Sequence, residues 1–133
     1  MTTRLTCREV SDFLMEYVGD DVTPAPQLRT VVLSAREAAG VFESLMESVE
    51  RMLGSNCVHG DLSAYNVLYW KRRPVVIDFP QSIDARENPN AFALLARDIE
   101  NVHGHCAKFT DELPANPLKL AIGLWERYLL ARL

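Results

Sequence analysis

The chain has 133 residues, of which 48% are hydrophobic and 24% are charged, and its formal net charge at pH 7 is −4. This composition is typical of one ordinary globular domain and excludes a disordered or collagen-like chain. The acidic balance, with no basic run longer than 71–73, argues against nucleic acid as a direct partner.

The first half of the chain predicts a strand, a loop and a long helix. The stretch "DFLMEYV", residues 12–18, is an apolar run of strand length that is followed by "GDD" and by Pro24 and Pro26. Ser34, with Glu37 three residues later, forms a capping-box pattern, and apolar residues then recur at helical spacing. We therefore predict a strand over 12–18, a loop, and a helix from Ser34 to Gly54.

The second half predicts a hairpin followed by two helices. Two short β-rich runs, "NVLYW" and "PVVIDF", are joined by the charged "KRR", which is the form of a β-hairpin. Asn88 and Pro89 open a segment with one apolar face, formed by Phe92, Leu95, Ile99, Val102 and Cys106. Asn116 and Pro117 open a last helix that we expect to run through Leu133. The predicted fold class is α+β, mostly α-helical with a small β-hairpin.

Cysteine usage and the apolar runs indicate the cellular compartment of the protein. Cys7, Cys57 and Cys106 are odd in number and form no C-x-x-C pair, which favours the reduced thiols of a cytosolic protein. No apolar run approaches the roughly 20 residues of a membrane span, and the N-terminus lacks the apolar region of a signal peptide. We expect a single cytoplasmic domain over residues 1–133 that is not held in a membrane.

Oxygen-bearing side chains gather around the predicted hairpin. Asp61 and Asn66 lie on the loop before its first strand, and Asp78 ends its second strand. Such a loop can turn Asp61 and Asn66 toward one point. Asp61 can accept a hydroxyl proton or orient water, whereas the oxygens of Asn66 and Asp78 suit Mg²⁺. The sequence therefore predicts phosphoryl transfer, with Asp61 as the base and Asn66 and Asp78 as metal ligands.

The pattern H-x-D-x-x-x-x-N followed by I-D-F resembles the catalytic and metal-binding loops of the protein-kinase superfamily. Here "HGD" stands in place of H-R-D, "DFP" stands in place of D-F-G, and no A-P-E follows. The stretches "HGDLSAYNVL", "VIDFPQSID", "NPNA" and "LLARDIENV" are similar to the RIO family of atypical kinases, over about residues 13–109. This resemblance implies a protein-kinase-like C-terminal lobe that uses ATP and Mg²⁺, without control by an activation segment.

The resemblance also implies an adenine pocket. The stretch "LMEYVG" matches the hinge that receives adenine, so that Met15 would be the gatekeeper. The backbones of Glu16 and Val18 would hydrogen-bond the base. Leu68 and Ile77 would form the floor of the pocket.

Further roles follow from the same resemblance. His59 is expected to brace the catalytic loop and not to act as a base, because the kinase superfamily uses its Asp for that step. Asp98, in "ARDIEN", resembles the helix Asp that holds the catalytic loop by its backbone N–H groups. The resemblance also permits Asp78 to take up phosphate as an aspartyl intermediate.

Some parts of a kinase site cannot be placed in this sequence. A kinase covers the phosphates with a Gly-rich loop and a strand Lys, but no G-x-G-x-x-G precedes the hinge and no Lys occurs before Lys71. We therefore expect a C-terminal lobe without its N-lobe, with impaired nucleotide affinity and turnover. Apolar surface would then be exposed along "FLMEYV" and the helix 34–53, which predicts self-association or recruitment of the missing lobe.

Two other functions stay open. A small-molecule phosphotransferase of the aminoglycoside or choline kinase type shares "HGDL" and a later "ID", although Ser63, Tyr65 and "DFPQ" fit the RIO family better. A catalytically silent lobe that serves as a binding module would also lack the Lys. The phosphoacceptor is open as well, and it could be a protein serine in a kinase or water in an ATPase. By family resemblance, a protein substrate or a ribosomal precursor is a possible partner.

Overall fold

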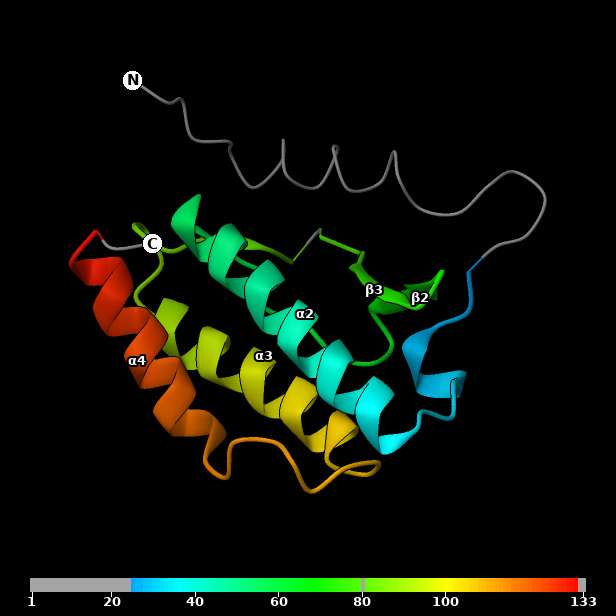
Figure 1. Cartoon of the computed structure of the whole chain (residues 1–133). Coiled ribbons are helices and arrows are strands. Elements are labelled where there is room, and N and C mark those ends of the chain that lie inside the picture. The colour runs from blue at the N-terminus through cyan, green and yellow to red at the C-terminus, as the bar shows by residue number, and fades with distance from the viewer. Residues whose placement is uncertain (1–24, 80, 132–133) are drawn as a thin grey trace.

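The computed structural model describes residues 25–79 and 81–131 (Figure 1). In chain order its elements are the 3-10 helix η1 (Leu28–Thr30), α2 (Ala35–Gly54), β1 (Cys57–Val58), β2 (Val67–Trp70), β3 (Arg73–Val76), β4 (Ile83–Asp84), α3 (Ala91–Cys106) and α4 (Pro117–Leu129). Long helices with short antiparallel strands confirm the predicted α+β class. Across the described ranges, every helix is too short or too polar to cross a membrane. The strand predicted over 12–18 lies outside the described residues.

Helix α2 begins and ends where the sequence predicts. Ser34 Oγ accepts a hydrogen bond from the Glu37 N–H at 3.1 Å, and Glu37 Oε1 accepts one from the Ser34 N–H at 3.0 Å, which completes the capping box. The apolar side chains of the helix are buried: Ala38, Val41, Phe42, Leu45, Val49, Met52 and Leu53. The expectation that this face would lie exposed is wrong, because α3, β1 and β3 pack against α2 and cover it.

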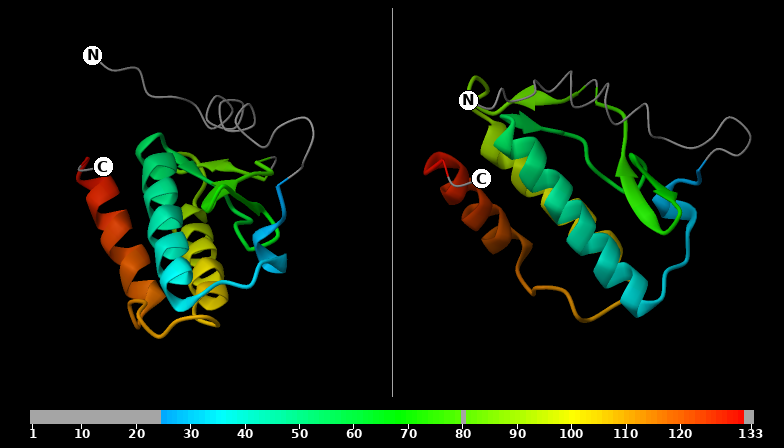
Figure 2. Two further views of the ribbon diagram at one scale, coloured as in Figure 1. Left: turned by 45° about the vertical axis from the view of Figure 1, so that its right-hand side comes forward. Right: turned by 45° about the horizontal axis from the view of Figure 1, so that its top comes forward.

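Helices α3 and α4 complete the helical part. Figures 1 and 2 show α3 running antiparallel to α2 and α4, with α4 on the outside of the group. Asn116 caps α4, since its Oδ1 accepts a hydrogen bond from the Lys119 N–H at 3.2 Å. The helix ends at Leu129 and not at the predicted Leu133, because Ala131 has a left-handed φ of 56° that an α-helix cannot continue.

Strands β2 and β3 form the predicted hairpin, with Val67 opposite Val76. Lys71 and Arg72 make its two-residue turn, and their positive φ angles of 49° and 64° match the twist of the strands. The second strand is shorter than predicted, because it ends before Ile77. A second antiparallel pair is formed by β1, which follows α2, and β4, which precedes α3.

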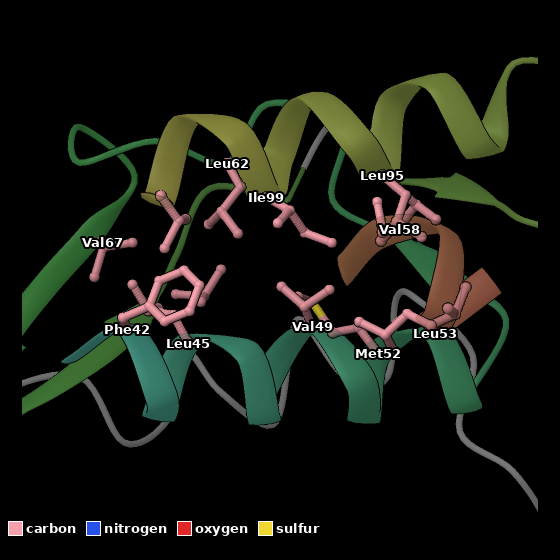
Figure 3. Close-up of a cluster of buried hydrophobic side chains, with 14 of the residues drawn as sticks. Phe42, Leu45, Val49, Met52, Leu53, Val58, Leu62, Val67, Leu95 and Ile99 are labelled. Carbon is pink, nitrogen blue, oxygen red and sulfur yellow. The ribbon is translucent and has the colours of Figure 1, made fainter. Parts of the chain in front are cut away.

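The core lies between α2 and α3 and holds the loop that precedes the hairpin. Leu62 belongs to this loop and is fully buried, as is Ile99 of α3. Burying one such side chain stabilises the fold by about 1.5–3 kcal/mol, so the loop next to Leu62 is held by the core itself. Figure 3 shows the side chains that face one another here, among them Phe42, Leu45, Val49, Val58, Leu62, Leu95 and Ile99.

Cysteine side chains contribute to this core. Cys57 lies in β1 with 1% of its surface exposed, and Cys106 at the end of α3 is fully buried. Burial raises the pKa of the Cys106 thiol to about 11, which keeps it protonated and unreactive. Both therefore pack as small apolar side chains, whereas Cys7 lies outside the described residues.

Candidate active site

His59 fixes the start of the loop that carries Asp61. The side chain is 1% exposed. Its Nε2 lies 2.8 Å from the Ile77 carbonyl oxygen, and its Nδ1 lies 3.1 Å from the Asp61 backbone nitrogen. Because a carbonyl only accepts and a backbone N–H only donates, the ring proton sits on Nε2 and Nδ1 is the acceptor. His59 thus ties Asp61 to Ile77, which confirms the predicted bracing role.

Gly60 passes through a backbone conformation that other residues rarely adopt. Its φ is 86°, and a Cβ built on it would lie 2.9 Å from the Gln81 carbonyl oxygen. This distance is shorter than real Cβ contacts, so the loop between His59 and Asp61 packs directly on the segment that follows Asp78. The site therefore requires glycine at position 60.

Asp98 of α3 holds the loop from the side of the core. The side chain is 2% exposed, and its two carboxylate oxygens accept hydrogen bonds from the N–H groups of Gly60 at 2.9 Å and of Leu62 at 3.0 Å. Burial raises the pKa of Asp98, while these two N–H groups and the nearby His59 and Arg97 lower it. The contacts confirm the role that the resemblance implies for Asp98.

Two neighbours of Asp98 hold the carbonyl groups of the same loop residues. Arg97 Nη2 donates to the Gly60 carbonyl, and Asn101 Nδ2 donates to the Leu62 carbonyl at 3.1 Å. The N–H and C=O groups on both sides of Asp61 therefore all have partners on one face of α3. Sequence reasoning missed Arg97 and Asn101. The signal was their spacing, since Asn101 is four positions from Arg97 and three from Asp98, and residues three or four positions apart lie on the same helix face.

Asp61 and Asn66 are joined directly. Asn66 Nδ2 donates to the Asp61 backbone carbonyl at 2.6 Å and lies 3.2 Å from the Asp61 carboxylate oxygen Oδ2. Because both acceptors hold the nitrogen end of the amide, the oxygen Oδ1 of Asn66 is the end that can bind a cation. The loop thus brings the predicted base and the predicted metal ligand together.

Asp78 follows the residue that lies opposite Asn66 across the hairpin. The Ile77 N–H donates to the Asn66 carbonyl at 2.9 Å, and Asp78 is the next residue. The prediction that Asp78 ends the second strand is wrong, because its left-handed φ of 63° turns the chain out of the strand. Such a conformation costs roughly 1–2 kcal/mol outside glycine. The structure therefore places Asp61, Asn66 and Asp78 at one end of the hairpin, with Asp78 exposed.

Leu68 and Ile77 lie on the hairpin face that is turned away from the core. Val67 and Val76 are 0% and 3% exposed and face inward. Because side chains alternate along a strand, Leu68 and Ile77 share the other face with Asn66, where both are half-buried. An apolar surface thus adjoins the oxygen ligands, as an adenine floor would require. The predicted hinge contacts lie outside the described residues: Met15, Glu16 and Val18.

An exposed aromatic ring lies beside the site, at Tyr65, for which the sequence predicted no contact. Tyr65, directly before Asn66, is 62% exposed, and the Arg29 guanidinium carbon lies 4.9 Å from the centre of its ring. The backbone N–H of Arg29 also donates to the backbone carbonyl of Ala64 at 3.1 Å. These contacts fasten η1 to the loop that carries Asp61 and Asn66.

The oxygen donors of this site fit a Mg²⁺ ion that is shared with phosphates. Carboxylate and amide oxygens, as in Asp78 and Asn66, are the hard ligands that Mg²⁺ prefers. In the part of the chain that the structure describes, no cluster of three His, Cys, Asp or Glu side chains could hold a metal alone. Mg²⁺ is commonly bound by one or two carboxylates while substrate phosphates supply further ligands. The set therefore suits a cation that arrives with a nucleotide.

Comparisons with known proteins agree with these features. The model of the RIO domain matches residues 9–115. The RIO-type serine/threonine-protein kinase Rio1 of Thermoplasma acidophilum is 37% identical over 89 residues, which are 67% of this chain and 45% of that protein. The human serine/threonine-protein kinase RIO1 is 34% identical over 91 residues, which are 68% of this chain and 16% of the human protein. The chain thus spans less than half the length of these relatives.

A solved structure shares the fold. The crystal structure of the Rio2 kinase–ADP/Mg²⁺–phosphoaspartate complex from Chaetomium thermophilum matches with a TM-score of 0.59 and 21% sequence identity. The match covers 83% of this chain and 38% of that chain. It confirms the predicted kinase-like fold.

Proposed function

Because this chain belongs to the RIO domain family, we propose that it is the catalytic lobe of an ATP- and Mg²⁺-dependent phosphotransferase that acts on a serine hydroxyl or on water. One observation carries the proposal: the hydrogen bonds of Asn66 Nδ2 to the carbonyl and carboxylate of Asp61, at the end of the hairpin where Asp78 follows the partner of Asn66, Ile77. Family membership favours this function over the small-molecule phosphotransferases that the sequence left open.

Each side chain has a separate role in this proposal. Asp61 accepts the proton of the attacking hydroxyl, since its backbone is fixed by His59 while its carboxylate is half-buried and not enclosed. Asn66 Oδ1 and the Asp78 carboxylate hold Mg²⁺. The cation, when bound, neutralises charge on the phosphates.

The half-buried Leu68 and Ile77 support the proposal that adenine stacks on the outer face of the hairpin. By resemblance, Met15, Glu16 and Val18 would contact the base from the hinge. The Rio2 structure from Chaetomium thermophilum contains ADP, Mg²⁺ and phosphoaspartate. By analogy, we propose that the Asp78 carboxylate can receive phosphate in this chain.

The cellular setting is part of the same proposal. Cys57 and Cys106 are free thiols that form no disulfide, which suits a reducing compartment such as the cytoplasm. A protein substrate or a ribosomal precursor follows from the family resemblance. Because the sequence holds no Lys before Lys71 to pair with the phosphates, we expect slow turnover from this chain alone.

Phosphate release and transfer from γ-labelled ATP test the proposal. The 133-residue chain should show slow, Mg²⁺-dependent transfer. Asp61→Asn should lower it by about 10²- to 10⁴-fold, the usual cost of a lost acid–base group. Asp111→Asn is a matched control, because Asp111 is an exposed carboxylate in the α3–α4 connection. Equal rates for Asp61→Asn and Asp111→Asn, or no transfer by any version of the chain, would count against catalysis and favour a silent binding lobe.

A further inference from the structure

Helix α4 carries apolar side chains on two faces, and only one face is covered. Ala121 and Leu124 are buried on the inner face. On the outer face Leu118, Ile122 and Leu129 are 43%, 42% and 66% exposed. Figures 1 and 2 show α4 on the outside of the helical group, consistent with this exposure.

The outer apolar residues have the spacing of a helix–helix seam. Leu118, Ile122, Trp125 and Leu129 are separated by four, three and four positions, which is the a/d pattern of an α-helical coiled coil. Trp125 is half-buried, with its ring 5.9 Å from that of Phe92 and 5.3 Å from that of Tyr128. These contacts hold one edge of the seam rigid. We call these four residues the α4 seam.

Charges beside the α4 seam favour one arrangement of two helices. Lys119 and Glu126 are exposed and lie one heptad apart, so they flank the seam on the same side. In an antiparallel pair of identical helices, the side of the seam that carries Lys119 and Glu126 faces the same side of the other copy. Lys119 of each copy then meets Glu126 of the other. In a parallel pair, Lys119 and Glu126 of one copy would instead face Ala121 and Tyr128 of the other copy, which carry no charge.

The register also agrees with the length of the helix. The pairing of Lys119 with Glu126 places the two-fold axis between Ile122 and Gly123, at the middle of Pro117–Leu129. Two helices paired in this way overlap over their whole length, and the central Ile122 side chains meet at the axis. The surface is thus self-complementary in charge and in register.

We propose that two copies of this chain associate through the α4 seam in an antiparallel arrangement. Self-association was expected from "FLMEYV", which lies outside the described residues, and from the face of α2, which is buried. A helix of 13 residues is only about 20 Å long, so the interface is at the small end of specific contacts. The dimer should therefore be weak, with dissociation in the micromolar-to-millimolar range. The proposal does not depend on catalysis.

Sedimentation equilibrium of the whole chain tests the proposal over concentrations from about 10 μM to about 1 mM. We expect a monomer–dimer equilibrium. Lys119→Glu or Glu126→Lys alone should weaken it by about tenfold, because each creates two like-charge contacts in a symmetric pair. The double variant K119E/E126K restores opposite charges and should regain most of the affinity. Neither residue is in the core, so these variants should fold.

Two further variants separate the α4 seam from other surfaces. Ile122→Lys should abolish the dimer, with circular dichroism confirming that the helices persist. Val32→Glu is the control, because Val32 is 86% exposed and lies outside α4. A monomer at about 1 mM, or a dimer that survives Ile122→Lys, would overturn the proposal. A double charge variant that binds no better than the single variants would overturn the antiparallel register.

Discussion

Gly60 packs against Gln81, so replacing it by alanine should destabilise the fold, whereas the same replacement at Gly104 should stabilise it. Gly60→Ala forces an L-residue to keep a φ of 86° and places its Cβ 2.9 Å from a backbone oxygen. The conformation alone costs about 1–2 kcal/mol, and the close contact adds to it, because the Gln81 carbonyl belongs to the backbone and cannot rotate away. We expect a loss of about 2–3 kcal/mol in the free energy of unfolding.

Gly104→Ala provides the matched control. Gly104 lies within α3, and a Cβ there would meet no atom within 4 Å. The change should stabilise the fold by about 0.8–1.0 kcal/mol, the difference in helix propensity between Ala and Gly. In a domain of this size, a change of 1 kcal/mol in the free energy of unfolding shifts the melting temperature by about 3–4 °C. The melting temperature should therefore fall by about 8 °C in Gly60→Ala and rise by about 3 °C in Gly104→Ala.

Thermal unfolding followed by circular dichroism measures both variants. Amide hydrogen exchange adds a local readout, since a displaced loop should weaken protection at Gly60 and Leu62, whose N–H groups bind Asp98. If Gly60→Ala is as stable as Gly104→Ala, the loop does not contact Gln81 as described, and the argument that glycine is required at position 60 is refuted.

Two further predictions concern α3. Asp98→Asn replaces one of two carboxylate acceptors by a donor that faces a backbone N–H, so it should lower the free energy of unfolding by about 1.5–3 kcal/mol in denaturant unfolding. Glu100→Gln, on the exposed side of α3, is the control and should cost almost nothing. Equal losses in the two variants would contradict the role of Asp98. Burial, with a smaller effect of Lys108, lowers the pKa of His105 in the folded chain, and its Nε2 has no hydrogen-bond partner among the described residues. Below its ordinary pKa of 6.5 the unfolded chain therefore binds more protons at His105, so this side chain should destabilise the fold progressively as the pH falls below about 7. His105→Phe should remove that part of the pH dependence, and an unchanged difference between pH 7 and pH 5 in urea unfolding would show that His105 titrates normally.

Local sequence signals predicted the helices well, because their information lies within a few residues. The capping box of Ser34 and Glu37 fixed the start of α2, and Asn116 with Pro117 fixed the start of α4. The end of α4 was missed because "LLARL" continues the apolar, helix-forming pattern and has no local stop signal, so that only the φ of Ala131 reveals the end.

The candidate site was predictable to a smaller extent, because its contacts join distant parts of the chain. Asp61 and Asn66 were found since they share one short loop. Asp98 was found only by family resemblance, and Arg97 was missed, because each binds Gly60 across more than thirty intervening residues. The left-handed turn at Asp78 was hidden because the apolar, β-rich run "PVVIDF" continues on both sides of it.

The central claim is that Asn66 and Asp78 hold the metal of a bound nucleotide while Asp61 serves the attacking group. Nuclear magnetic resonance of the labelled chain tests it directly, with MgADP added and a trace of Mn²⁺ as a paramagnetic probe. We predict that signals of Asn66 and Asp78 broaden first, that Asp78→Asn weakens this effect strongly, and that Asp61→Asn largely preserves it. Asp78 should matter more than Asn66, because it supplies a charge and not only a dipole. Absence of binding at millimolar MgADP, or binding that is lost in Asp61→Asn and normal in Asp78→Asn, would contradict the account.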